Sequence, residues 1–251
     1  SDRLPRLIDP CHGLNDLRQG VIRAVSPTAL ERDAARLLRA VRLAAELGFS
    51  IDRETETMIQ RHSPLITSVA GERLREELLR LLALPQTKTL WYYLEELGIL
   101  TTLIPELALT KGVAQPKEHF WDVFNHSLET VATTDFLLRQ GDWDYAGEEC
   151  LAAVPWSAEL AQHFKDEVSR GSTRRSLLKL AALLHDLAKP QTKALNAKGR
   201  MRFLGHTGEG AAIAANILER LRFSTKEIKL VETMVKHHLR PGQMSHDGVP
   251  S

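Results

Sequence analysis

The chain has 251 residues, of which 43% are hydrophobic and 26% are charged, a composition that excludes a disordered or fibrous protein. Its 33 basic and 32 acidic side chains leave a formal charge of +1, which excludes a strongly basic protein that coats nucleic acid but allows a local basic patch. Cys11 and Cys150 are the two cysteines, so a disulfide scaffold and an all-cysteine zinc site are excluded and a reducing cytoplasm is the expected compartment. No apolar run approaches the roughly 18 residues of a membrane span, so we expect no membrane partner.

Helical periodicity dominates the first part of the chain. The spacing of apolar residues predicts one helix over 28–47, with a capping box between Thr28 and Glu31 and an end at Gly48. Further helices are expected over 52–61, 71–84, 87–97 and 101–109. Residues 1–110 are therefore predicted to form a helical module.

The second part of the chain is also predicted to be mostly helical. A linker over 110–120 comes first, and the acidic stretch 141–171 is expected to be an irregular insertion that holds one amphipathic piece. Helices are expected over 122–140, 173–188, 207–221 and 224–238, the last with a capping box between Ser224 and Glu227. Residues 192–205 contain the best candidate for a β-hairpin, around Asn196 and Gly199. The sequence thus predicts an all-α fold with two regions, 1–110 and 111–251, the second carrying a small hairpin.

A histidine next to an aspartate ends the most apolar predicted helix. His185 and Asp186 directly follow the apolar run 177–184, where a charged pair is costly unless something compensates it. A divalent metal ion would do so, since imidazole nitrogen and carboxylate oxygen are suitable ligands. Such an ion would also lower the pKa of a bound water and make hydroxide near neutral pH.

Other histidines lie on different predicted helices or at their starts, so several helices could supply ligands to one ion. They are His126, His206, His237 and His238. The alternative is that each histidine merely caps or fills a helix. The order His, His-Asp, His, His-His over residues 117–240 resembles the HD superfamily of metal-dependent phosphohydrolases.

This resemblance implies a set of metal ligands, residue by residue. They are His126, His185, Asp186, His206, and either His237 or His238. The superfamily pattern ends with an aspartate on a later helix, whereas Asp247 lies in a predicted loop close to His238. The last ligand is therefore expected to be missing.

A second constellation lies in an arginine-rich helix. Asp33 and Arg36 are three residues apart and share a face of the predicted helix. One interpretation is a solvated surface ion pair of small energetic value. The other is base recognition, in which the carboxylate accepts from the exocyclic amino group of cytosine or adenine and the arginine donates to the neighbouring ring acceptor. Arg39 and Arg42 would then be free to meet phosphates.

Several motifs in this part of the chain occur in a characteristic order. They are Asp16-Leu17-Arg18-x-Gly20, Asp33-x-x-Arg36, Leu38-Arg39-Ala40-Val41-Arg42, Gly48-Phe49 and Glu72-Arg73. Over residues 7–107 the chain resembles the bacterial tRNA nucleotidyltransferase and poly(A) polymerase family (class II). The resemblance implies that Asp33 and Arg36 act as an amino-acid template for CTP and ATP, and that Glu72 and Arg73 steady the neck helices.

The resemblance also implies a catalytic head before residue 1, a sheet domain that binds Mg²⁺, which no segment of the chain matches. We therefore expect a neck and HD portion that does not transfer nucleotides by itself. Its expected partners are tRNA or another RNA 3′ end and the nucleotides ATP and CTP, for addition of CCA or poly(A).

Two alternatives compete with this interpretation. One is a freestanding HD phosphohydrolase that acts on nucleotides or cyclic phosphates, and the other is a non-catalytic helical module. The motifs in residues 7–107 favour the nucleotidyltransferase, because a plain HD hydrolase needs no template helix.

Overall fold

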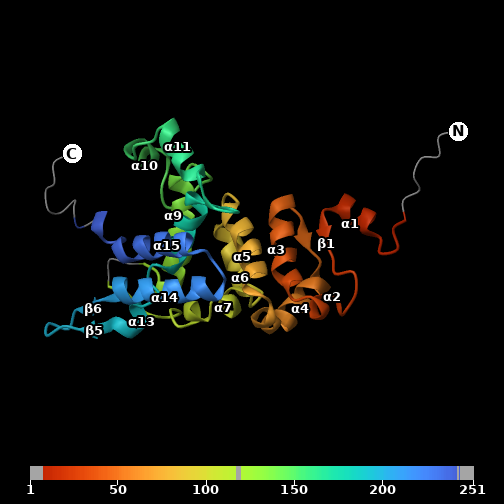
Figure 1. Cartoon of the computed structure of the whole chain (residues 1–251), viewed down its shortest axis with the longest axis horizontal. Helices are drawn as coiled ribbons and strands as arrows, with labels where there is room; N and C mark the ends of the chain where they lie inside the picture. Colours follow the sequence, from red (N-terminus) through yellow and green to blue (C-terminus); the bar gives the residue numbers. More distant parts are fainter. Residues whose placement is uncertain (1–7, 117–119, 242, 244–251) are drawn as a thin grey trace.

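The structure of the chain is a computed structural model that describes residues 8–116, 120–241 and 243. It confirms the predicted all-α class, since the strands within these residues form only two-stranded pairs. The first half of the chain lies at one end of the long axis and the second half at the other (Figure 1). None of the helices in the described part of the chain is long and apolar enough to cross a membrane.

The first half consists of short helices and two longer ones, α3 (Ala35–Leu47) and α5 (Gly71–Ala83), which pack against each other. Its other helices are α1 (Gly13–Gln19), α2 (Ala29–Arg32), α4 (Arg53–His62), the 3-10 helix η1 (Ser63–Ser68), α6 (Lys88–Glu96), α7 (Leu100–Leu103) and α8 (Pro105–Ala108). Two short strands, β1 (Val21–Ile22) and β2 (Ser50–Ile51), pair in parallel. Helical periodicity gave no indication of this pair, because two-residue strands carry no alternation to detect.

The prediction of one continuous helix over 28–47 is wrong. The backbone leaves the helical conformation at Asp33, where φ is −150° and ψ is 93°, and this residue separates α2 from α3. The Asp33 carboxylate accepts a hydrogen bond from the backbone nitrogen of Ala35 at 3.3 Å, a local contact that competes with helix continuation. The capping box predicted at Thr28 is also wrong, because its side chain makes no capping hydrogen bond.

The helix predicted over 101–109 is divided in the same way. It consists of α7 and α8, which meet at Ile104. Pro105 lacks a backbone N–H and disfavours the helical conformation of the residue before it, so the helix stops there.

The second half contains the longest helices, α9 (Val123–Leu137) and α14 (His206–Arg220), together with shorter ones. Its other helices are α10 (Glu148–Ala153), α11 (Ala158–Lys165), α12 (Arg174–Leu184), α13 (Lys189–Thr192) and α15 (Thr225–His237). The antiparallel pairs are β3 (Glu167–Ser169) with β4 (Ser172–Thr173), and β5 (Lys193–Leu195) with β6 (Met201–Phe203). The second pair confirms the predicted hairpin, and the predicted capping box between Ser224 and Glu227 is present.

Two predictions for the second half need correction. The insertion over 141–171 holds two short helices, α10 and α11, rather than one. The helix predicted over 173–188 ends at Leu184, so His185 and Asp186 lie in the turn that follows α12. Both residues are thereby placed at a helix end, where their side chains can converge with those of other elements.

One buried hydrophobic cluster runs through both halves, from Leu30 to Val235. Helix α5 packs against α3 on one side and against α12 on the other, and α6 packs against α9. Figure 1 shows α5 and α6 between the two ends of the molecule. The region boundary predicted near residue 110 is therefore not a break in packing.

Candidate functional site

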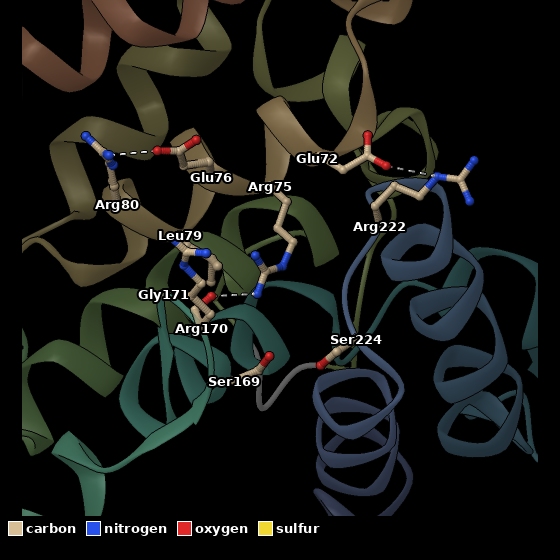
Figure 2. A pocket seen from close by; sticks show the side chains of 10 residues that line it. All are labelled: Glu72, Arg75, Glu76, Leu79, Arg80, Ser169, Arg170, Gly171, Arg222 and Ser224. Carbon is tan, nitrogen blue, oxygen red and sulfur yellow. Dashed lines mark hydrogen bonds and ion pairs between the residues drawn. The ribbon is translucent and has the colours of Figure 1, made fainter.

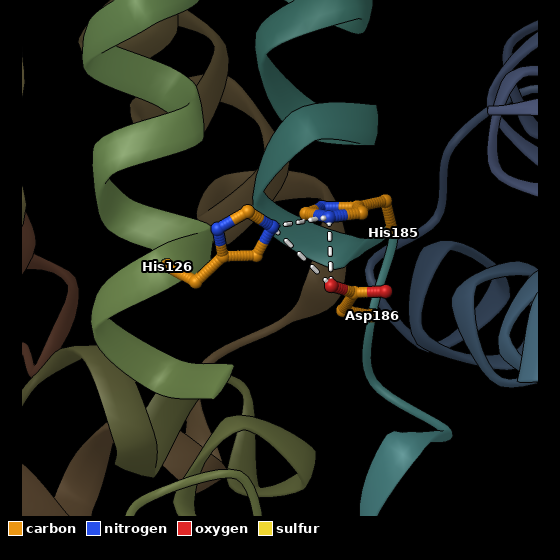
Figure 3. A group of neighbouring side chains, drawn as sticks. All are labelled: His126, His185 and Asp186. Carbon is orange, nitrogen blue, oxygen red and sulfur yellow. Dashed lines mark hydrogen bonds and ion pairs between the residues drawn. The ribbon is translucent and has the colours of Figure 1, made fainter. Parts of the chain in front are cut away.

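The histidine constellation converges on Asp186. His126 comes from α9, His185 and Asp186 follow α12, His206 is the first residue of α14, and His238 directly follows α15. Figure 3 shows His126, His185 and Asp186 pointing toward one another from two elements. Asp186 is 1% exposed, so its charge is almost wholly removed from water.

Two sets of ligand atoms share the Asp186 carboxylate. On one side, Asp186 Oδ2 lies 2.9 Å from His185 Nε2 and 3.4 Å from His126 Nε2, and the two imidazole nitrogens are 3.2 Å apart. On the other side, Asp186 Oδ1 lies 3.6 Å from His206 Nε2 and 3.7 Å from His238 Nε2. Each set could hold one ion, with the carboxylate between them.

The sequence left His237 and His238 as alternatives for one position, and the tertiary structure distinguishes them. His238 belongs to the second set, whereas His237 is exposed and belongs to neither set of the described residues. Adjacent residues of a helix point about 100° apart, so only one of the two can face the cluster.

Backbone carbonyls orient three of these imidazoles. The Nδ1 atoms of His185, His206 and His238 lie 2.8, 2.6 and 2.7 Å from carbonyl oxygens. The carbonyls belong to Ala182, Phe203 and Val235. Because a carbonyl only accepts, each Nδ1 must donate its proton, which leaves Nε2 of the neutral ring as a lone pair directed to Asp186. This is the arrangement that metal-ligating histidines use.

The ionisation states suit a cation. Burial alone would raise the pKa of Asp186, but His185 and Lys189 beside it hold that pKa well below its usual range, so the carboxylate is ionised. Burial lowers the pKa of His238, which favours the neutral ring. The Asp186 carboxylate and the His238 ring can therefore both offer lone pairs for coordination.

The residues fit a divalent metal by their unsatisfied atoms as well. In the described part of the chain, His206 Nε2 and Asp186 Oδ1 are buried and have no hydrogen-bond partner, whereas Asp186 Oδ2 is paired with Lys189. Ligand atoms that share one ion with bonds of about 2.1 Å stand roughly 3.0–3.4 Å apart, close to the spacing of the first set. The last ligand was expected to be missing, and Asp247, which lies near the position it would take in the chain order, is outside the described residues.

Sequence reasoning missed two residues at this site. Lys189 is buried, and its Nζ lies 2.6 Å from Asp186 Oδ2 and donates to Gln115 Oε1 at 2.6 Å. Lys189 was detectable in principle, as a lysine three residues after Asp186 and close to an apolar helix. Gln115 was not, because it reaches the site from a segment without periodicity.

The second candidate site surrounds Asp33 at the break between α2 and α3. Arg73 of α5 binds this carboxylate with both terminal nitrogens, each at 2.9 Å. Arg36 Nε lies 3.7 Å from Asp33 Oδ2 and its NH1 donates to the carbonyl of Ala29. The hydrogen bond from Arg73 is the main reason that the pKa of Asp33 is below its usual range.

Arg39 and Arg42 do not stand free as expected. Arg39 donates to Glu77 at 2.7 Å, and Arg42 is 5% exposed and contacts both Glu77 and Glu46. The expectation that Arg42 is free to meet phosphate is wrong, because its guanidinium is enclosed between α3 and α5. Arg39 keeps an exposed side chain, so its nucleotide-binding role stays a prediction.

Comparisons with known proteins match both regions. Residues 48–110 match the family described as "Probable RNA and SrmB- binding site of polymerase A", and residues 147–249 match the HD domain. The HD match contains His185, Asp186, His206 and His238, while His126 precedes it.

Curated relatives align with most of this chain. The A-adding tRNA nucleotidyltransferase of Deinococcus radiodurans is 32% identical over 240 residues, which cover 93% of this chain and 48% of the relative. The CC-adding tRNA nucleotidyltransferase of Thermus thermophilus is 34% identical over 230 residues, which cover 89% of this chain and 45% of the relative. This chain thus spans about half the length of the curated relatives it matches.

A solved structure shares the fold. The chain called "tRNA-processing enzyme (apo form I)" aligns with a TM-score of 0.59 at 16% identity, covering 98% of this chain and 50% of that one.

Proposed function

Because this chain belongs to the bacterial tRNA nucleotidyltransferase and poly(A) polymerase family (class II), we propose that it is part of an RNA-processing nucleotidyltransferase. Its two halves then correspond to the neck and HD regions of the family. In this proposal the chain selects CTP or ATP for addition to the 3′ end of tRNA or another RNA. Transfer itself takes place in a Mg²⁺-binding head.

The observation that carries this proposal is the conformation of Asp33. The Asp33 carboxylate lies at the break between α2 and α3, and Arg73 orients it through two hydrogen bonds. Its side chain remains 24% exposed, so an amino group of cytosine or adenine can reach it, and the 47% exposed Arg36 stands beside it to donate. Guanine and uracil present a carbonyl where the amino group would be, and an ionised carboxylate repels it.

The test is nucleotide incorporation by this chain joined to the nucleotidyl-transfer head of its Deinococcus radiodurans relative. We expect Asp33→Ala to lower the preference for CTP and ATP over GTP and UTP by at least tenfold, since one bidentate base contact contributes about 1–3 kcal/mol. Arg32→Ala removes a neighbouring exposed charge and serves as the control. Unchanged selectivity in the Asp33 variant, with normal folding, would refute the template role.

A second function is favoured by the two ligand sets around Asp186. We propose that the HD cluster binds a divalent metal and hydrolyses phosphate esters, such as nucleotides or cyclic phosphates. A bound ion would supply a hydroxide near neutral pH. The chain's own contribution is to present lone pairs of fixed tautomers, while Lys189 adds a positive charge beside the site that would attract a phosphate.

Hydrolysis of a 2′,3′-cyclic nucleotide, measured with added Mn²⁺, Ni²⁺ or Mg²⁺, tests this second function. We expect the purified chain to release product and Asp186→Asn to release none. Equal background rates for the two proteins would leave the cluster as a structural element.

A further inference from the structure

A cavity of about 620 Å³ opens where the neck meets the HD region. Its walls come from α5, from the turn between β3 and β4, and from the turn between α14 and α15 (Figure 2). Four arginines and two glutamates line it, and once the buried Glu227 that pairs with Arg75 is counted, an excess of one positive charge remains. None of these residues belongs to the Asp33 site or to the HD cluster.

One of the four arginines, Arg75, is held in place by contacts with residues beneath and beside the cavity. Arg75 is paired at 2.6 Å with Glu227, which is fully buried, and its guanidinium lies 5.2 Å from the ring centre of Phe223. It also donates to the backbone carbonyl of Arg170 at 3.1 Å. Arg75 therefore ties α5 to both turns and holds the walls in place.

The other three arginines are available to a ligand. Among the residues that the structure describes, Arg80 pairs only with Glu76 on its own helix, and both side chains are more than half exposed, so this pair contributes little to stability. Arg222 Nε lies 3.8 Å from Glu72, a long contact between two side chains that are each about two-thirds exposed. Arg170 is exposed and takes part in no ion pair within the described ranges.

The backbone of the two regions is in close contact beside the cavity. A Cβ atom at Gly71, where α5 begins, would lie 2.5 Å from the carbonyl oxygen of Arg220. Arg222 has a φ of +61°, a left-handed conformation that favours glycine, yet an arginine occupies it. The two regions are thus in backbone contact beside the cavity, and Arg222 occupies a conformation that glycine would adopt with less strain.

We propose that this cavity binds phosphate groups through Arg170, Arg222 and Arg80, which lie on different walls of the cavity (Figure 2), with the Ser224 hydroxyl as a further donor. Guanidinium groups bind phosphate bidentately, and the residues that line the cavity include four arginines, no lysine and one large apolar side chain, Leu79. If the chain has the RNA-processing function proposed above, an RNA backbone would supply this phosphate. The identity of the phosphate source rests on that proposed function, whereas phosphate binding itself does not. A free phosphate or mononucleotide is the other source of the same chemistry.

The experiment compares two double variants of the full chain that lose the same charge. Arg170→Gln with Arg222→Gln alters the cavity, and Arg200→Gln with Arg202→Gln alters exposed positions on the β5–β6 hairpin. Binding of a tRNA transcript that lacks its 3′-terminal CCA is measured by fluorescence anisotropy at several salt concentrations. We expect the cavity variant to raise the Kd about tenfold and to lower the salt slope by about 1–2, and the hairpin variant to change the Kd less than about twofold.

A titration with inorganic phosphate distinguishes the two sources. The resonances of arginine Nε–Hε groups are followed in the unaltered chain and in the cavity variant. Phosphate-dependent shifts that the variant loses, without an RNA effect, identify a site for free phosphate. If neither RNA binding nor the phosphate shifts differ between the cavity and hairpin variants, the proposal is overturned. Nucleotide selection at Asp33 is measured separately, so its failure would leave this result intact.

Discussion

The ammonium of Lys179 is fully buried and lies 2.7 Å from Asp135 Oδ1. Lys179 also donates to the backbone carbonyl of Leu84 at 2.7 Å, while Asp135 Oδ2 accepts from both the nitrogen and the hydroxyl of Thr87. The pair therefore joins α12 and α9 of the second half of the chain to the turn between α5 and α6 of the first half. Burial lowers the pKa of Lys179, so the partner carboxylate is needed to keep it charged.

Removal of this ammonium is expected to lower the free energy of unfolding. Lys179→Met leaves the Asp135 carboxylate buried and unpaired, which costs about 3–5 kcal/mol of the free energy of unfolding. Lys226→Met, at an exposed position of α15, is expected to change it by less than about 0.5 kcal/mol. Urea unfolding of both variants measures the difference.

A compensating change checks the explanation. Asp135→Asn in the Lys179→Met background removes the unpaired charge but retains an acceptor for Thr87. It should recover at least half of the lost stability, and a further loss instead would show that the charge pair is not the cause.

Glu77 is expected to hold α3 against α5. It is 3% exposed and binds both Arg39 and Arg42, so Glu77→Gln leaves the buried Arg42 with only Glu46 as counterion. We expect a loss on the order of 3 kcal/mol in the free energy of unfolding. Glu76→Gln is the matched control, because this neighbour is 62% exposed and its pair with Arg80 contributes at most about 0.5 kcal/mol. Equal midpoints of urea unfolding for the two variants would contradict this account.

Metal binding is expected to depend on His238 and not on its neighbour. His238→Ala removes one Nε2 atom near Asp186, whereas His237→Ala removes an exposed imidazole from the same helix end. Elemental mass spectrometry of the purified chains should find near-stoichiometric metal in the unaltered chain and His237→Ala, and less in His238→Ala. Metal loss in His237→Ala alone would show that the side chains are arranged differently from this structure.

The ion pair between Glu106 and Arg220 should give stability a pH dependence. The two side chains form hydrogen bonds of 2.7 and 3.0 Å between α8 and α14. Burial alone would raise the pKa of Glu106, but the bonds from Arg220 hold it below its ordinary value of 4.5. The unfolded chain therefore binds more protons in the window below that value, so this stabilisation is present at higher pH and is lost as pH falls through the folded pKa.

Glu106→Gln should remove that dependence. Near pH 7 the variant is expected to be less stable by under about 1 kcal/mol, because Arg220 is 46% exposed and solvent screens the pair. The two proteins should converge in urea unfolding as the pH falls through the folded pKa of Glu106, below which the carboxylate is protonated in both states. A constant difference across this range would rule out titration of Glu106 as its origin.

Periodicity, turn chemistry and motif order over short spans were sufficient to predict the all-α class, the β5–β6 hairpin, the capping box at Ser224 and the family. The sequence also indicated which histidines and which Asp–Arg pair to inspect. It did not show that Asp33 interrupts a helix, since the local periodicity continues through that residue while a side-chain hydrogen bond ends the helical backbone.

Which charged side chains are buried, and which partners they contact, follows from the tertiary packing and not from the local sequence. Arg42 resembles a surface arginine in the sequence, but packing of α3 on α5 buries it against Glu77. His238 differs from His237 only by its rotation about the helix axis relative to Asp186. Lys189 meets Gln115 across 74 positions of the chain, and contacts at such separations leave no periodic signal in the sequence.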